Sequence, residues 1–565
     1  MFIFSELSIK KKRSMLRLRL RARQRMLSSK YPLAHLRVLL DGVMRKPLCL
    51  PQNASAGLLP EYVAPELEIC LRQHLTTSFL QSGVLSDFYG FIHGTHKSIC
   101  LALPPALRRA AAGEGIKIKP LVSRWMWLRL QVKYMLGGMR FAVGLVLSNL
   151  RGRLAVPVGG KPYVVFMTIS KRALPEKIDP STDGWDMINW YRRSKLYDGE
   201  LSEIWFNLTG DEPDFNYDPL IKIVQSPLVA LPTGRSFISF VFEAIYLCLI
   251  AFASLLIGRW WAPIVLLDSI GVAYVKRIPD SQRAKDYFFH SSVLSIRPLW
   301  TYAVEKTGSR VTCIMYSHHF PIINPAGPDI PNINPVLAHL SWGRYAIWDG
   351  DQRDDILKLG GRDGEFVEVG PISVVDDVKT SRPELPANSV AIFDVNPIRP
   401  SMEVFHGLVR PYFSVENMLA FLDQSCRAIK AGGGIPVLKT KGDFDATYFQ
   451  ASRFIELADK HGCVVLEPGI SPFWLVKNAS AVITCPFTSI PSIGDLFGTP
   501  SCYFDPTGQL VGFERNAHGN DLVIGMEALR QWVTKSLNGE TENAVYKTDD
   551  HPNCLHEEIA GKGAA

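Results

Sequence analysis

The pattern of apolar and polar positions changes near residue 155. Residues 1–155 hold few runs of strand type and no internal repeat, which predicts a mostly helical region. After residue 160, short apolar and β-branched runs appear at 163–167, 204–206 and 310–316, with helical stretches between them. Strands that alternate with helices predict βαβ units and a parallel sheet.

A second series of strands and helices follows the first. The predicted strands lie at 390–393, 435–438, 464–466, 481–484 and 501–504, and the predicted helices at 414–431 and 447–461. This alternation predicts a doubly wound sheet, which binds ligands at the carboxyl ends of its strands. The fold class is therefore α/β, with two Rossmann-type domains facing a cleft.

These patterns also predict where the domains begin and end. We expect a basic arm and a mostly helical extension at 1–155 and an N-terminal Rossmann-like domain at 156–385, with an apolar insert at 236–275. A C-terminal Rossmann-like domain should occupy 386–535, and a tail 536–565. The linker between the two sheets is predicted at Val369-Gly370-Pro371 and the polar, proline-bearing stretch 376–388.

One segment is long and apolar enough for a bilayer. Residues 237–257 read FISFVFEAIYLCLIAFASLLI, interrupted only by Glu243. A glutamate is costly in lipid, so a helix packed in the protein, or lying in one leaflet, is favoured over a true span. Residues 125–150 mix aromatic, aliphatic and arginine side chains in the manner of an interfacial helix, although an ordinary amphipathic helix has the same pattern.

The net charge of +8 is concentrated at one end of the 565-residue chain. Ten basic residues stand against Glu6 within residues 1–30, and the remainder is close to neutral. A nucleic-acid enzyme needs basic residues spread over a folded face, so the arm suits anionic lipid, or a solvated tail, better than nucleic acid.

The 10 cysteines are scattered singly, without a C-x-x-C pair or a Cys/His group at zinc spacing. Unpaired cysteines predict a reducing compartment, and no signal peptide is evident. We expect a cytoplasmic protein, peripherally associated with the inner membrane, that carries no metal and no cofactor.

The most informative stretch is 485–495, CPFTSIPSIGD, which leaves a strand and enters a helix. Thr488 and Ser489 stand where an N-cap belongs, and Pro491 lies in the first turn. A helix N-terminus lined with hydroxyl groups suits a phosphate, although plain capping explains the same residues.

The run from Pro486 to Asp505 resembles the signature of the polysaccharide biosynthesis PFTS-motif family. Its layout is similar to the donor-binding half of GT-B glycosyltransferases that make capsule and lipopolysaccharide. The resemblance implies a GT-B-like fold and a nucleotide-sugar donor. It also implies that the donor is held by part of this run, namely Pro486, Phe487, Thr488, Ser489, Ser492 and Asp495.

Two further elements end strands of the predicted sheets. Lys439 and Lys441 follow the strand that starts at 435, where related enzymes carry a lysine and then His-Pro, and they are candidates to neutralise the donor phosphate. His318 and His319 follow the strand at 310–316 and are candidates for the catalytic base, with His319 preferred. Strand-capping histidines are the alternative, and Asp268 and Asp286 are reserve bases.

Two D-x-D patterns, at 349–351 and 443–445, do not predict a metal site. Asp349 lies between a strand and a helix, which is an N-cap setting.

Taken with the resemblance, these features predict an inverting, metal-independent glycosyltransferase of bacterial surface polysaccharide. It would transfer a sugar, with a CMP-linked acidic sugar as the first choice, to a glycan or lipid-linked acceptor. A teichoic-acid-type transferase using a CDP-polyol and a non-catalytic, membrane-associated assembly factor are the alternatives.

Overall fold

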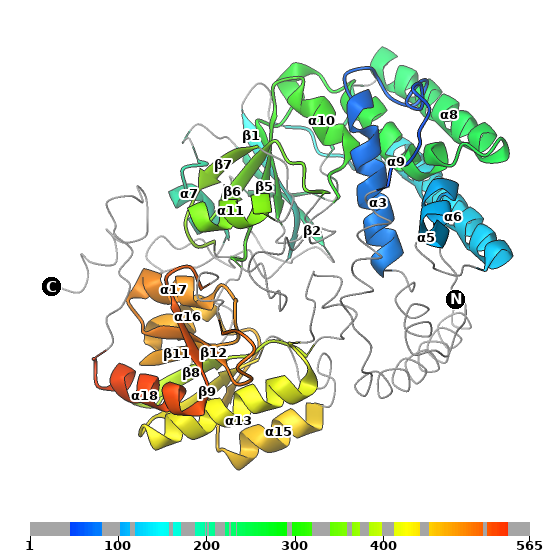
Figure 1. The fold of residues 1–565 in the computed structure, drawn as a ribbon. Coiled ribbons are helices and arrows are strands. Elements are labelled where there is room, and N and C mark those ends of the chain that lie inside the picture. Colours follow the sequence, from blue (N-terminus) through cyan, green and yellow to red (C-terminus); the bar gives the residue numbers. More distant parts are fainter. Residues whose placement is uncertain are drawn as a thin grey trace, which may run out of the picture.

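The computed structural model contains two parallel β-sheets and a layer of helices (Figure 1). It describes residues 46–81, 102–113, 119–157, 162–170, 187–197, 199, 203–209, 221–224, 226, 228–232, 234–290, 296–318, 339–358, 364–372, 383–397, 412–440, 451–511 and 517–540. The basic arm, His319, Lys441 and most of the tail lie outside these ranges.

The first sheet has seven strands in the order β3-β2-β1-β4-β5-β6-β7. They are β1 (Tyr163–Ser170), β2 (Glu203–Thr209), β3 (Ile221–Val224), β4 (Asp286–His290), β5 (Arg310–Ile314), β6 (Arg344–Ile347) and β7 (Glu365–Glu368). Every pairing is parallel. The strand order reverses between β1 and β4, so the sheet is doubly wound, as predicted.

The second sheet has six parallel strands in the order β10-β9-β8-β11-β12-β13. They are β8 (Ser389–Phe393), β9 (Ile435–Lys439), β10 (Val464–Leu466), β11 (Ala481–Thr484), β12 (Ser501–Asp505) and β13 (Asp521–Ile524). The order reverses between β8 and β11, which places the crevice of this sheet at the carboxyl ends of those two strands. The expected α/β fold of two Rossmann-type sheets is confirmed.

Alternating side chains of the strands enter separate cores, as expected for sheets covered on both faces. In β1, Tyr163 and Val165 pack against the N-terminal helices, whereas Val164 and Phe166 belong to a core that continues into the second sheet. The opposite face of the second sheet packs against α13 (Val415–Ala431), α15 (Ala451–Lys460) and α18 (Met526–Leu537). The two sheets therefore share a continuous apolar core.

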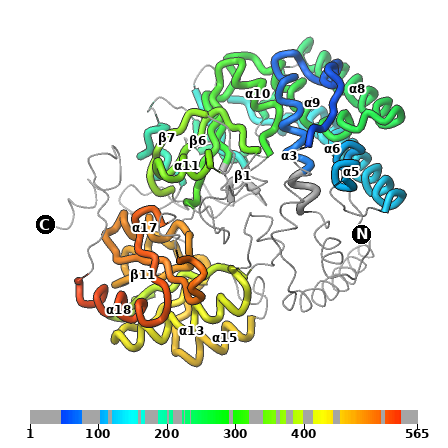
Figure 2. Tube along the Cα trace, in the orientation of Figure 1, coloured from blue at the N-terminus to red at the C-terminus, as the bar shows by residue number. Residues whose placement is uncertain are grey.

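The helical layer covers the face of the first sheet that is turned away from the second sheet. It contains α3 (Leu67–Gln81), α5 (Pro105–Gly113), α6 (Pro120–Leu150), α8 (Arg235–Leu256), α9 (Trp261–Val275) and α10 (Leu299–Glu305), with the 3-10 turns η1 (Ala64–Glu66) and η3 (Asp280–Gln282) beside them. In the tube view, the blue α3 and the green α8 to α10 lie together although they are distant in sequence (Figure 2).

Helix α9 is apolar on all sides and almost wholly buried, because α3, α6, α8 and α10 pack around it. A Cβ atom at Gly138 of α6 would lie 2.7 Å from the Leu266 side chain of α9, so only glycine permits this close approach. The remaining helices are α7 (Met187–Arg193), α11 (Gly350–Lys358), α16 (Pro472–Asn478) and α17 (Ile490–Phe497).

Helices α6 and α8 are the two described helices that are long and apolar enough to cross a membrane, judged by length and composition alone. Only 28% of the apolar window of each is buried, so neither is an enclosed core helix. Glu243, the single acidic residue of α8, forms an ion pair with Arg277, which follows α9. The charge of this glutamate is therefore balanced by an arginine of the same protein.

A candidate active site between the two sheets

The PFTS segment, residues 486–489, leaves β11 at the crevice of the second sheet. Strand pairing aligns Lys439 of β9, Phe393 of β8 and Thr484 of β11 across the carboxyl edge of the sheet. Residues that follow these strands therefore meet at one place, where doubly wound sheets bind nucleotides.

The segment ends at the start of α17. Ser489 is the N-cap residue and Pro491 lies in the first turn, both as predicted, and Gly498 closes the helix in the left-handed region at φ 65°. The Ser489 side chain makes no capping hydrogen bond. The half-buried Ser489 hydroxyl therefore remains available to a ligand at the positive end of the helix.

The neighbouring hydroxyl of Thr488 is used by the protein. It lies 2.7 Å from the Thr484 hydroxyl, and the Thr488 carbonyl accepts a hydrogen bond of 2.7 Å from Tyr503 Oη. Phe487 is 5% exposed and packs edge-on against the Tyr503 ring, and Pro486 is buried too. Phe487, Pro486 and Thr488 thus shape the turn that presents Ser489.

Lys439 and Asn396 add polar groups to the same crevice. Lys439 Nζ donates to the Pro468 carbonyl at 3.2 Å, and burial lowers the pKa of this lysine to about 8, opposed by the charge of Asp394. Asn396, just after β8, has a buried Oδ1 without a hydrogen-bond partner among the described residues. A largely buried lysine and an unsatisfied amide oxygen suit a site completed by a ligand.

A cleft of about 490 Å³ lies between the two sheets. Its walls are the start of α11 after β6, the buried face of α17 and a loop after β12, and α11 faces α17 in Figure 1. The lining residues are Asp349, Gly350, Asp351, Arg353, Asp354, Ser492, Asp495, His518, Gly519 and Asn520. Helices α11 and α17 follow the carboxyl ends of β6 and β11, whereas His518, Gly519 and Asn520 lie directly before β13.

His318 is buried behind Asp349 on one wall. Its Nε2 lies 2.9 Å from Asp349 Oδ1, and the same oxygen accepts a hydrogen bond of 2.9 Å from the Gln352 amide. Asp349 is therefore the N-cap of α11, as predicted, and it also orients His318. A carboxylate that fixes an imidazole is the arrangement by which proteins prepare a general base.

His518 links the two walls. Its Nε2 lies 3.0 Å from Asp355 Oδ2 of α11, and its ring meets the His318 ring edge-on at 5.4 Å between centroids. Burial lowers the pKa of His518, but the hydrogen bond and charge of Asp355, with the charges of Asp351 and Asp349, outweigh burial and raise it. These carboxylates favour the protonated form of His518, whose contact with Asp355 joins the second sheet to the first.

Asp495 lies in α17 on the opposite wall from Asp349. Burial raises its pKa to about 7, helped by the charges of Asp349 and Asp521 and opposed by His318. A carboxyl group that titrates near neutral pH in a cleft can give or take a proton. Asp495, His318 and Asp349 therefore form one interacting acid–base group.

The structure places both reserve bases, Asp268 and Asp286, away from the cleft. Asp268 is 3% exposed in the helical layer, where it binds His74 and the Leu299 amide. Asp286 begins β4, at the amino edge of the sheet, and contacts Thr312, Arg310 and Arg344; burial raises its pKa to about 6. Both carboxylates have structural partners away from the cleft.

Sequence reasoning missed His518, Asp355 and Asn396 as site residues. His518 lies 163 positions from its partner Asp355, so no local pattern joins them. The signal that was present is the D-x-D at 349–351, which we interpreted as an N-cap and which also lines the cleft.

Residues 245–533, just over half of the 565-residue chain, match the family model described as "Polysaccharide biosynthesis PFTS motif protein". The chain belongs to this PFTS family. The matched range begins within α8 and extends into α18, so it contains the cleft and the PFTS segment that names the family. No curated protein matches the sequence.

Solved structures match the PFTS protein distantly. UGT89C1 of Arabidopsis thaliana is 11% identical with a TM-score of 0.37, over 68% of this chain and 91% of that one. The sucrose-phosphate synthase of Thermosynechococcus elongatus is 11% identical with a TM-score of 0.37, over 71% and 99%. The UDP-GlcNAc 2-epimerase of Neisseria meningitidis, bound to UDP-GlcNAc, is 10% identical with a TM-score of 0.34, over 66% and 90%. These values are too low to bear on function.

Proposed function

We propose that this PFTS protein is a glycosyltransferase that transfers a sugar from a nucleotide donor to a glycan or lipid-linked acceptor during synthesis of bacterial surface polysaccharide. One observation carries the proposal. The PFTS segment leaves β11 at the crevice of a doubly wound sheet, and α17, which follows it, lines a cleft that holds an acid–base group. Family membership in polysaccharide biosynthesis supports this assignment.

In this proposal the crevice of the second sheet holds the donor phosphates. The amide groups at the start of α17, the Ser489 hydroxyl and Lys439 stabilise the negative charge that develops as the nucleotide departs. Lys441, outside the described residues, remains a candidate for the same task. Ser492 and Asp495, one and two turns along α17, face the sugar in the cleft.

The acceptor hydroxyl loses its proton in the cleft. His318, oriented by Asp349, is the proposed base, and His319 remains the alternative on the same strand end. Attack by the resulting alkoxide on the anomeric carbon, with departure of the nucleotide from the opposite face, inverts that carbon and needs no metal. A CMP-linked acidic sugar remains the first donor to test.

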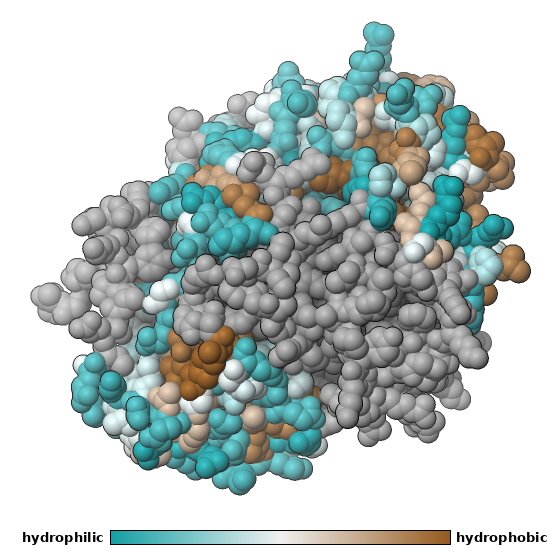
Figure 3. Space-filling model, viewed as in Figure 1, coloured by the Kyte–Doolittle hydropathy of each residue, from teal (hydrophilic) through white to brown (hydrophobic). Residues whose placement is uncertain are grey.

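We also propose that the protein sits on the inner membrane through α6 and α8. One face of α8 packs on α9 through Phe240, Ala244, Leu247 and Ala251. The opposite face repeats at helical spacing, is at least 49% exposed and is apolar: Ile238, Phe242, Ile245, Leu249, Phe252 and Leu256. Apolar atoms gather at the edge of the molecule formed by these helices (Figure 3). A helix with one face on the protein and an equally apolar outer face suits the acyl region of one leaflet.

A thermal-shift screen of nucleotides and nucleotide sugars tests the donor proposal. A donor present at a hundred times its dissociation constant should stabilise the protein by about 2.7 kcal/mol. A shift with CDP-glycerol or CDP-ribitol alone would instead support polyol-phosphate transfer. Binding without turnover of any sugar would favour an assembly factor, and no shift with any nucleotide would contradict the donor site.

A further inference from the structure

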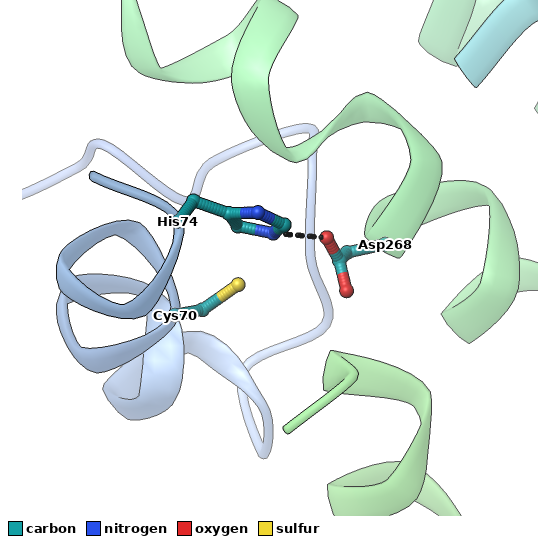
Figure 4. A group of neighbouring side chains, drawn as sticks. All are labelled: Cys70, His74 and Asp268. Atoms are coloured by element: carbon teal, nitrogen blue, oxygen red, sulfur yellow. Dashed lines mark hydrogen bonds and ion pairs between the residues drawn. The ribbon is translucent and has the colours of Figure 1, made fainter. Parts of the chain in front are cut away.

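Three side chains able to bind a metal converge in the helical layer, away from the cleft. Cys70 and His74 are four residues apart on α3 and so share one face, and Asp268 faces them from α9. One sulfur, nitrogen or oxygen atom from each lies within 4.8 Å of the other two. Figure 4 shows the three side chains pointing toward one another.

The contacts within this group leave donor atoms unused. His74 Nε2 lies 2.9 Å from Asp268 Oδ2, while the other Asp268 oxygen accepts a hydrogen bond of 3.1 Å from the Leu299 amide. Cys70 is fully buried, and its thiol has no hydrogen-bond partner among the described residues. Within the part of the chain that the structure describes, His74 Nδ1 is buried without a hydrogen-bond partner as well.

The Asp268 carboxylate is also almost shut off from solvent. Asp268 is 3% exposed, and its one ion-pair partner in the described part of the chain is His74. Buried carboxylates are normally paired with a cation or bound to a metal. A divalent ion between Asp268, His74 and Cys70 would satisfy the carboxylate and give the thiol a partner.

The chemical types of the three ligand atoms indicate which metal would bind. Thiolate sulfur, imidazole nitrogen and carboxylate oxygen together suit Zn²⁺, at about 2.3 Å for sulfur and about 2.0–2.2 Å for nitrogen and oxygen. Tetrahedral geometry at those bond lengths separates the ligand atoms by roughly 3.3–3.6 Å. Small side-chain movements from the present spacing reach that range.

We propose that Cys70, His74 and Asp268 form a zinc site that fastens α3 to α9, with a water molecule completing the tetrahedron. The same Asp268 carboxylate binds the start of α10, and α9 is the helix on which the apolar α6 and α8 pack. Zinc would thus lock the N-terminal helices onto the layer that carries the exposed apolar faces. The site is independent of the proposed transferase activity.

Metal titration of the chelator-treated, full-length protein tests this site. One equivalent of Zn²⁺ should bind per chain and raise the melting temperature, whereas Mg²⁺ should not. Cobalt(II) in place of zinc should give a thiolate-to-metal charge-transfer absorption. Cys70→Ser should abolish that absorption and lower zinc affinity at least tenfold, and His74→Gln should lower the affinity similarly.

Two variants control for unspecific binding. Cys49→Ser removes an exposed thiol, and His461→Gln disrupts a second His–Asp pair, His461 with Asp423 at 2.8 Å. Both should bind zinc as the unmodified protein does. Circular dichroism of Cys70→Ser, which nearly preserves side-chain volume, checks that the variant is folded. Stoichiometric zinc binding that survives in folded Cys70→Ser, or the absence of any zinc binding, would overturn the site.

Discussion

Ser489 and Ser414 occupy equivalent positions at helix starts but have different hydrogen bonds. Ser414 is the N-cap of α13 and accepts a hydrogen bond of 3.2 Å from the Asn417 amide. Ser489 is the N-cap of α17 and makes no such bond. A hydroxyl that does not cap its own helix, at the crevice of a doubly wound sheet, is available for phosphate.

Replacing Ser489 by alanine should therefore weaken donor binding with little loss of stability. Ser414→Ala is the matched control, and it should cost about 1 kcal/mol of stability while leaving donor affinity intact. Calorimetry with the donor found in the nucleotide screen and thermal melting measure the two effects. Unchanged donor affinity in Ser489→Ala, and in the Thr488/Ser489 double alanine variant, would remove this hydroxyl pair from the site.

Asp495 should make stability depend on pH. Its pKa is raised from the usual value to about 7, so the folded protein binds a proton more tightly than the unfolded chain between pH 4 and 7. The contribution of this group to the free energy of unfolding therefore falls as the pH rises through that interval, and it is constant above it. Asp495→Asn should remove the penalty and stabilise the protein at pH 8, by on the order of 1–2 kcal/mol after solvent screening.

Melting temperatures of the unmodified protein and Asp495→Asn, measured from pH 5 to pH 8, check this expectation. The advantage of the variant should grow with pH. An advantage that is equal at pH 5 and pH 8, or a variant that is less stable at pH 8, would show that the Asp495 carboxyl is not held protonated by the cleft.

At the scale of single residues, the sequence predicted features set by local chemistry but not contacts set by tertiary packing. Ser489 at an N-cap, Pro491 in the first turn and Asp349 capping α11 follow from local chemistry, and the structure confirms their positions. The unused Ser489 hydroxyl and the Asp349 contact with His318 depend on tertiary packing. Cys70 and His74 stand at helical spacing in the sequence, but Asp268 comes from a helix nearly two hundred residues later.

Strands were predicted best where they lie inside a sheet. The runs at 390–393, 435–438 and 481–484 fall within β8, β9 and β11, which are flanked on both sides and almost entirely buried. The missed strands β3, β7 and β13 are four-residue edge strands with half-exposed side chains, which give little apolar signal. β4 was also missed, although it lies inside the first sheet.

The outer face of α8 should hold the protein on membranes. Phe242→Glu with Leu249→Glu places two charges among side chains that are 69% and 63% exposed, which costs several kcal/mol in lipid and little in water. The double variant should leave the membrane pellet for the soluble fraction while keeping its melting temperature. Val511→Glu, at a residue that is also 69% exposed but lies in the second domain, is the matched control and should stay with membranes.

Fractionation with and without alkaline carbonate measures this behaviour. Release of the unmodified protein by carbonate fits a helix lying in one leaflet, and resistance to carbonate would mean that α8 or α6 spans the bilayer. An unmodified protein found wholly in the soluble fraction would contradict the membrane proposal, and so would a double variant that pellets like the Val511→Glu control.

The cleft exists because the two sheets meet through a shared core. Ala346 and Trp348 of the first sheet join Ala391, Val437 and Val482 of the second in one buried apolar cluster. The cluster brings Asp349 opposite Asp495, and His518 within reach of Asp355. Hydrophobic patterning predicts that each sheet has buried faces, but not which face meets which. The sequence therefore predicted two domains facing a cleft and named His318 and Asp495 as site residues, but it did not predict that they interact with Asp349 in that cleft.

Variants of the acid–base group in the cleft test the proposed base. His318→Ala should lower turnover by about 10²- to 10⁴-fold while donor affinity stays unchanged, because general base catalysis contributes that much and His318 lies apart from the donor crevice. Asp349→Asn should lower turnover as well, since asparagine can still cap α11 but cannot stabilise a protonated imidazole. His461→Ala, which removes a histidine from an equivalent His–Asp pair outside the cleft, is the matched control and should retain full turnover.

The pH dependence of turnover separates His318 from Asp495. Loss of the base should remove the acidic limb of the profile, so the limb should vanish in His318→Ala and persist in Asp495→Asn. The opposite result, a limb near pH 7 that survives in His318→Ala and disappears in Asp495→Asn, would assign the base to the carboxyl group whose pKa is about 7. If both variants keep turnover and limb, neither group takes the acceptor proton, and His319 becomes the residue to replace.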